Sequence, residues 1–134
     1  MPNRAIEIHD SVLSAISFSS GLAELRFSLV YIHQTEGEPG RDPGSVWGQE
    51  AVLRIKNASV SGMFSGLPVD LWDGEITIGE SRSDNEIPVP LRYEGKTELR
   101  LEALRQAQEV VTFSGNGVEM ELIGEPQYLE EFRP

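Results

Sequence analysis

Apolar and polar side chains alternate along most of the chain with a period of two, which predicts β-strands that bury one face. The alternation is clearest in residues 109–123, where Asn116-Gly117 interrupts it with the pair best suited to a type I′ hairpin turn. A slip of one residue would bury Glu119 and Glu121, so the pattern fixes the predicted register. The face predicted to be buried consists of Val111, Phe113, Val118, Met120 and Leu122.

The same alternation predicts further strands at 4–9, 12–19, 22–33, 50–58, 75–79, 87–93 and from 97 to about 103. Asp10-Ser11 separates the first two, and Ser20-Gly21 and Asp73-Gly74 are predicted turns. Pro88 and Pro90 lie on one side of their strand, which is typical of a sheet edge.

The longest predicted strand, 22–33, is apolar on both faces at its end. Leu25, Phe27, Leu29, Tyr31 and His33 share one face, yet Val30 and Ile32 on the other face are also apolar. We expect a loop, a helix or a second subunit to cover that second face.

Four segments interrupt the strands. Residues 34–48 hold three glycines and two prolines before Trp47 and predict a long loop, either functional or disordered. Residues 60–71 predict irregular backbone, and 81–86 a polar loop. A helical turn is expected after about Ala103, and a short helix with Pro126 in its first turn is expected to close an open end of the sheet.

The fold class predicted is all-β: an antiparallel barrel or two-sheet sandwich of about eight or nine strands with a short C-terminal helix. The 134 residues amount to a single domain, 1–134.

The net charge limits the classes of partner that we expect. The chain has 22 Asp and Glu against 11 Lys and Arg, a formal net charge of −11. That balance disfavours nucleic acid and anionic membranes, whose phosphates bind Lys and Arg. The acidity serves solubility or attracts a basic protein or cationic ligand.

Cysteine is absent, which excludes disulfides, thiolate zinc sites and cysteine nucleophiles. The chain reaches charged residues before any long apolar run, so we expect no secretory signal and a cytoplasmic protein. The sequence contains no cofactor-binding motif, and we predict no cofactor.

Catalytic motifs are weak. His9-Asp10-Ser11 has the residue types of a hydrolase triad, but neighbours on a strand point to opposite faces, so we interpret it as a strand end. His9 and His33 could join Asp10 or Asp42 in a metal site with two histidines and one carboxylate. No metal is predicted, because no spacing motif supports this set.

Binding candidates are the amphipathic side chains near strand ends and loops. Tyr31, Trp47, Trp72 and Tyr93 are of a type common in ligand pockets and interface centres, although core packing also explains each. His33 and Arg41 complete the predicted ligand or partner site. Asp70, Asp73, Glu75 and Glu80 surround a predicted turn and are interpreted as solvated surface.

The opening Ile-Glu-Ile-His-Asp-Ser, followed by two strands up to Tyr31, resembles the start of several small bacterial all-β families of unknown function. Some of these are proposed immunity proteins for polymorphic toxins. The resemblance is carried by His9, Asp10 and the apolar positions after them, under a quarter of the chain. It implies a bacterial cytoplasmic domain that binds a protein, and it assigns no catalytic residue.

Three functional hypotheses follow. The first is a non-enzymatic protein-interaction module that self-associates, as a dimer, through the face of Val30 and Ile32, so that Ile32→Glu would break association without unfolding. The second is a small-molecule-binding barrel with Trp47 and Trp72 at its mouth and residues 34–48 as lid. The third is a metal-dependent enzyme that uses His9 or His33.

Overall fold

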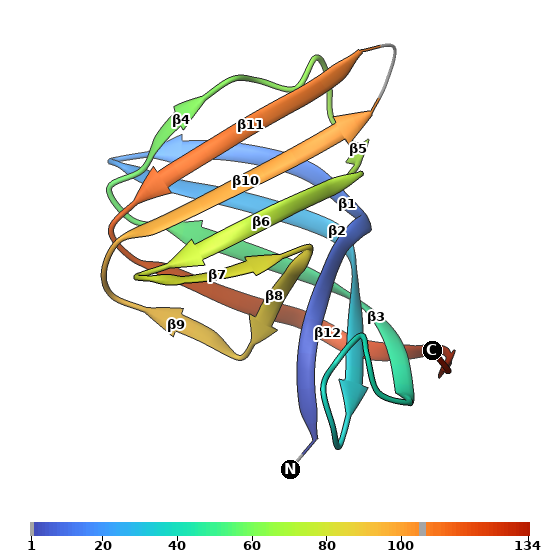
Figure 1. Cartoon of the computed structure of the whole chain (residues 1–134). Helices are drawn as coiled ribbons and strands as arrows, with labels where there is room; N and C mark the ends of the chain where they lie inside the picture. The colour runs from blue at the N-terminus through green and yellow to red at the C-terminus, as the bar shows by residue number, and fades with distance from the viewer. Residues whose placement is uncertain (1, 105–106) are drawn as a thin grey trace.

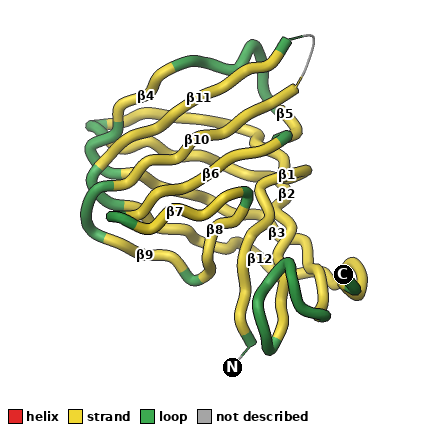
Figure 2. Tube along the Cα trace, viewed as in Figure 1, coloured by secondary structure: helices red, strands yellow, loops and turns green. Residues whose placement is uncertain are grey.

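The computed structural model describes residues 2–104 and 107–134, which form strands and loops only (Figures 1 and 2). The strands are β1 (Asn3–Ser19), β2 (Leu22–Thr35), β3 (Gly44–Ile55), β4 (Ser59–Ser61), β5 (Val69–Asp70), β6 (Asp73–Ile78), β7 (Ser81–Asp84), β8 (Glu86–Val89), β9 (Leu91–Tyr93), β10 (Thr97–Leu104), β11 (Gln108–Gly115) and β12 (Val118–Phe132). The all-β prediction is therefore confirmed. Among the described residues there is no helix long and apolar enough to cross a membrane.

Two antiparallel sheets pack as a sandwich (Figure 1). The seven-stranded sheet has the order β5-β1-β2-β3-β12-β9, with β8 also paired to β1, and the five-stranded sheet has the order β4-β11-β10-β6-β7. Their inward side chains form one core, and the largest include Phe113, Leu13, Leu25, Leu53 and Leu99. The barrel alternative is wrong, because the sheets do not close into one another.

The first hairpin follows the sequence prediction. Ser20 and Gly21 both have positive φ angles, 52° and 80°, as the two central residues of a type I′ turn require. Ser19 consequently pairs with Leu22, and β1 and β2 continue as a long antiparallel ribbon.

The predicted edge strand 87–93 is two edge strands. β8 pairs with β1 and β9 pairs with β12, at opposite ends of the seven-stranded path. Only Pro90 separates them, so this sheet curls until its two edges approach each other.

The predicted hairpin at Asn116-Gly117 is wrong, because β11 and β12 belong to different sheets. The connection instead binds the end of β3: Asn116 N donates to Lys56 O at 2.8 Å, and Lys56 N donates to Gly117 O at 3.0 Å. A Cβ on Gly115 would lie 2.4 Å from Ile55 Cγ2, so this crossing needs glycine. Both sheets face the same core, which explains why the alternation resembled that of a hairpin.

The predicted faces of β2 are wrong beyond Phe27. The pairing with β3 shifts between Phe27 and Val30, a β-bulge that reverses which side chains face inward. Val30 and Ile32 are 0% and 2% exposed, whereas Leu29 and Tyr31 are only half-buried. Val30 and Ile32, which were expected to be covered by a loop, a helix or a second subunit, therefore lie in the core between the two sheets.

Residues 126–132 are strand, not the predicted helix. They pair with β3 from Gln127 to Phe132, and this pairing overrides local helix preference. Pro126 falls in the register break between Ile123 and Gln127, where its missing N–H removes no ladder hydrogen bond.

Other boundaries differ as well. The predicted loop 34–48 is shorter, because β2 runs to Thr35 and β3 begins at Gly44. Asp73-Gly74 begins β6 instead of forming a turn, and Gly74 lies so close to Arg100 O that a Cβ would approach to 2.6 Å. The expected polar loop 81–86 contains β7 and the start of β8. Strand β10 reaches Leu104, and the helical turn expected beyond it falls partly on 105–106, outside the described residues.

Candidate functional site

The strand register builds a polar face on the outer side of the seven-stranded sheet. One cross-strand row runs Pro88, Ala5, His33, Val46 and Glu130, through β8, β1, β2, β3 and β12. The next row on the same face runs Glu86, Glu7, Tyr31, Gly48 and Gln127. Directly opposed side chains in adjacent strands are close enough to interact, so residues distant in sequence form one surface.

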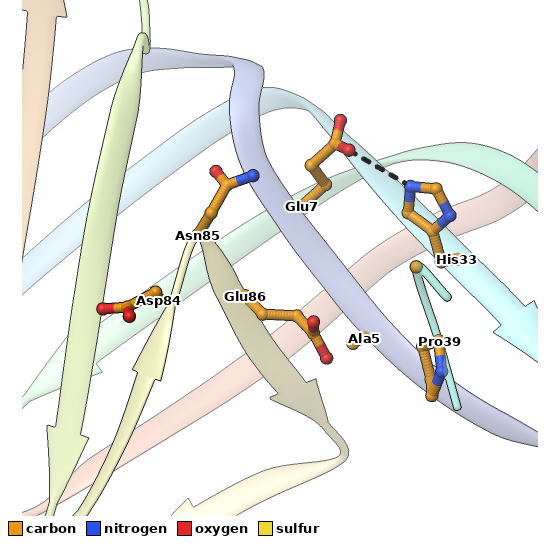
Figure 3. A pocket seen from close by; sticks show the side chains of 8 residues that line it. Ala5, Glu7, His33, Pro39, Asp84, Asn85 and Glu86 are labelled. Atoms are coloured by element: carbon orange, nitrogen blue, oxygen red, sulfur yellow. Dashed lines mark ion pairs between the residues drawn. The ribbon is translucent and has the colours of Figure 1, made fainter. Parts of the chain in front are cut away.

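A small recess lies where this face meets the β2–β3 loop (Figure 3). We call it the acidic recess; its volume is about 110 Å³ and it is lined by Ala5, Glu7, His33, Pro39, Gly40, Asp84, Asn85 and Glu86. Three of these side chains are carboxylates. A recess of this size accommodates the end of one side chain, because pockets for whole small molecules measure about 300–1,000 Å³.

A bulge in β1 and the turn at Asn85 fix one wall of the acidic recess. Pairing of β1 with β2 is interrupted between Glu7 and Val12, where Asp10 has a φ angle of 70°. Asn85, which precedes β8, binds the other edge of β1 beside this bulge: its Oδ1 accepts from His9 N at 2.8 Å and its carbonyl accepts from Ile8 N at 3.0 Å. The site is thereby built on anchored strands, which hold it in place.

The shortened loop between β2 and β3 forms the opposite wall. Glu38 O accepts hydrogen bonds from Arg41 N and Asp42 N, while Thr35 Oγ1 donates to Pro43 O at 2.7 Å. These bonds hold Pro39 and Gly40 against the sheet.

His33 is the centre of the face and is 8% exposed. Its Nε2 lies 3.3 Å from Glu7 Oε1, and its ring packs edge to face on Phe132 with centroids 4.9 Å apart. Its Nδ1 is buried and has no hydrogen-bond partner among the described residues. The imidazole is therefore held by packing and by one carboxylate (Figure 3).

Glu86 is the carboxylate of the recess that lacks a counterion. It forms no ion pair within 4 Å in the part of the chain that the structure describes. Burial raises its pKa, and the negative charge of Glu38 raises it further, outweighing the opposite effects of His33 and Arg41. Figure 3 shows this side chain directed across the recess toward Pro39.

A wider depression adjoins the acidic recess and shares Glu7 and His33 with it. It measures about 330 Å³ and is also lined by Asp10, Tyr31, Val46, Glu130 and Phe132. The two hollows together present five carboxylates, namely Glu7, Asp10, Asp84, Glu86 and Glu130. No lysine or arginine among the described residues lines either hollow.

The structure brings three predicted site residues to this face. Tyr31 and His33 lie in it, and Arg41 stands beside it in the β2–β3 loop, exposed and 3.6 Å from Glu38 Oε1. The other three lie elsewhere. Trp47 packs against Tyr128 with centroids 5.4 Å apart, and Trp72 is 54% exposed against His9. Tyr93 lies on β9, packed on the core.

The proposed pair of histidine ligands is not assembled. His9 Nδ1 lies 2.6 Å from the carbonyl oxygen of Trp72, and this hydrogen bond raises the pKa of His9. Across residues 2–104 and 107–134, no three His, Asp or Glu side chains are grouped so that they could hold a metal ion. Of the acidic residues predicted to be solvated surface, Glu75 forms ion pairs with Arg82 at 2.7 Å and with Arg100 at 3.3 Å.

Sequence reasoning missed Glu7, Asp84, Asn85 and Glu86. Glu7 was assigned to a strand and the others to a polar loop, and no local spacing distinguishes them from the chain's other acidic residues. Only the pairing of β8 with β1 places Glu86 opposite Glu7.

Comparison with protein-family models, with curated proteins and with solved structures finds no match.

Proposed function

We propose that the protein is a non-enzymatic interaction module that binds a basic partner protein, and that the acidic recess receives the cationic end of a partner side chain. The single observation behind this is Glu86, a half-buried carboxylate that forms no ion pair with any described residue and faces a hollow shared with Glu7 and Asp84. A half-buried anion is costly unless a cation accompanies it. An entering guanidinium or ammonium group would supply that cation.

Shape and charge support the same partner class. The recess fits one side-chain end, and the neighbouring depression adds Asp10 and Glu130 on the same face. The net charge of −11 draws a basic protein toward this surface from a distance.

The other two hypotheses lack a comparable observation. A small-molecule site would use the β2–β3 loop, which does line the recess, but neither tryptophan lies there. A metal-dependent enzyme would need a ligand set that the described residues do not form. The homodimer stays a prediction, and its original basis, an uncovered face at Val30 and Ile32, is wrong.

The test uses ethylguanidinium as a stand-in for an arginine side chain, titrated into isotope-labelled protein and followed by NMR. We expect saturable chemical-shift changes at Glu86, Glu7 and His33. In Glu86→Gln the affinity for ethylguanidinium should be at least several-fold weaker. Glu98→Gln is the matched control, because Glu98 is exposed on β10 in the other sheet. Equal affinities of Glu86→Gln and Glu98→Gln for ethylguanidinium, or chemical-shift changes that never saturate, would refute the proposal.

A further inference from the structure

Strand β12 leaves much of one edge unpaired. Its partner on one side is β3, but on the other side β9 covers only Val118 to Met120. Within the described residues, no strand pairs with that side of β12 from Glu121 to Phe132. An open edge of this kind presents unpaired backbone N–H and C=O groups, which form a template for another strand.

The side chains along this edge are accessible to a partner. All residues from 124 to 131 are exposed, including Tyr128 at 50% and Leu129 at 45%. Figure 1 shows the end of β12 extending, with the ends of β1, β2 and β3, beyond the five-stranded sheet. An added strand would thus meet apolar contact surface as well as backbone groups.

The charges along the open edge of β12 determine which kind of strand can pair with it. Glu125, Glu130 and Glu131 lie along the open segment, and Glu130 belongs to the row that contains His33. A second copy pairing there would bring the Glu130 and Glu131 carboxylates of both chains together, and like charges across strands are destabilising. Pro126 and the register breaks at Ile123/Gln127 and Tyr128/Glu130 limit any added strand, from a second copy or from another protein, to a short segment. A basic strand meets the same carboxylates as counterions.

We infer that residues 127–132 of β12 are a β-augmentation site for an extended, basic segment of a partner protein. This inference rests on the proposed function, since it states how the basic partner docks. An added strand would lie about 14 Å from β2, three strand spacings away. The acidic recess must therefore engage a different part of the partner.

The experiment measures binding of two fluorescent ten-residue peptides that alternate lysine with valine. One is unmodified, and the other is N-methylated at two adjacent central residues, which blocks both of its edges while preserving its charge. We expect the modified peptide to bind about tenfold more weakly or worse, because several edge hydrogen bonds are lost. We also expect the unmodified peptide to slow amide hydrogen exchange at 127–132.

Paired charge variants test the contribution of the edge. Glu130→Lys with Glu131→Lys should abolish binding. Glu80→Lys with Glu98→Lys changes net charge equally at exposed positions of the five-stranded sheet and its β6–β7 turn and should retain most of the binding. Circular dichroism verifies that each variant is folded.

The outcomes are decisive. Equal binding of the two peptides, equal loss in both charge variants, or no binding of the unmodified peptide would overturn edge docking. A dimer with protected amides at 127–132 would show that a second copy occupies the edge and would overturn it too. Failure of the proposed function is separate, because it appears as loss of the ethylguanidinium response at Glu86 in protein whose edge still binds peptide.

Discussion

The bulge in β2 predicts an order of mutational destabilisation opposite to the order expected from simple alternation. Without a bulge, Leu29 would face the core together with Leu25 and Phe27, and Ile32 would lie outside. With the bulge, Ile32 is 2% exposed and Leu29 is only half-buried. Truncating each to alanine therefore measures which face is inside.

The magnitudes follow from burial. Removing a fully buried isoleucine side chain to alanine costs about 2–5 kcal/mol, whereas a half-exposed leucine costs about 1 kcal/mol. An unfolding entropy of about 2.1 cal/mol/K per residue gives roughly 0.28 kcal/mol/K for 134 residues. Ile32→Ala should therefore lower Tm by roughly 7–18 °C and Leu29→Ala by roughly 4 °C.

Thermal unfolding followed by circular dichroism, together with urea titration, measures both variants. A larger loss for Leu29→Ala than for Ile32→Ala would refute the bulge and restore the simple alternation. The structure also reverses the expectation for Ile32→Glu: a carboxylate would enter the core, so that variant should unfold the monomer and not merely separate subunits.

Two further variants test other features. Gly115→Ala should destabilise the fold by about 1–3 kcal/mol in urea titrations, because its Cβ would meet Ile55 Cγ2 and Lys56 O. An unchanged stability would contradict the close crossing. Glu86→Gln tests the raised pKa of Glu86: the folded state binds that proton more tightly, so native stability falls as pH rises from the ordinary value of 4.5 through the folded pKa. Glu86→Gln should thus be more stable than the wild-type protein at about pH 7 and should lose this advantage below the ordinary pKa of 4.5. A stability difference that does not change with pH would contradict the raised pKa.

Local alternation predicted several of the longer strands and much of the core. Inward positions such as Val111, Phe113 and Val118 were identified because a half-buried strand shows its buried face at every second residue. The turn at Ser20-Gly21 was also predictable, since positive φ angles at two successive positions depend on local residue chemistry.

Tertiary structure decided which strands meet. The pattern of Val111 to Leu122 fits a hairpin and a sheet-to-sheet crossing equally well, because both alternatives direct the same side chains inward. Pairing with β3 likewise made residues 127–132 a strand although their local composition favours a helix.

The candidate site illustrates the same division. The sequence showed an acidic chain and marked His33 and Tyr31, but it gave no reason to join Glu7 with Glu86. Long-range pairing of β8 with β1, two bulges and the folded β2–β3 loop brought those carboxylates around one buried imidazole. Local chemistry determines where a strand can form, whereas competition among many nearly equivalent pairings is settled only by packing of the whole chain.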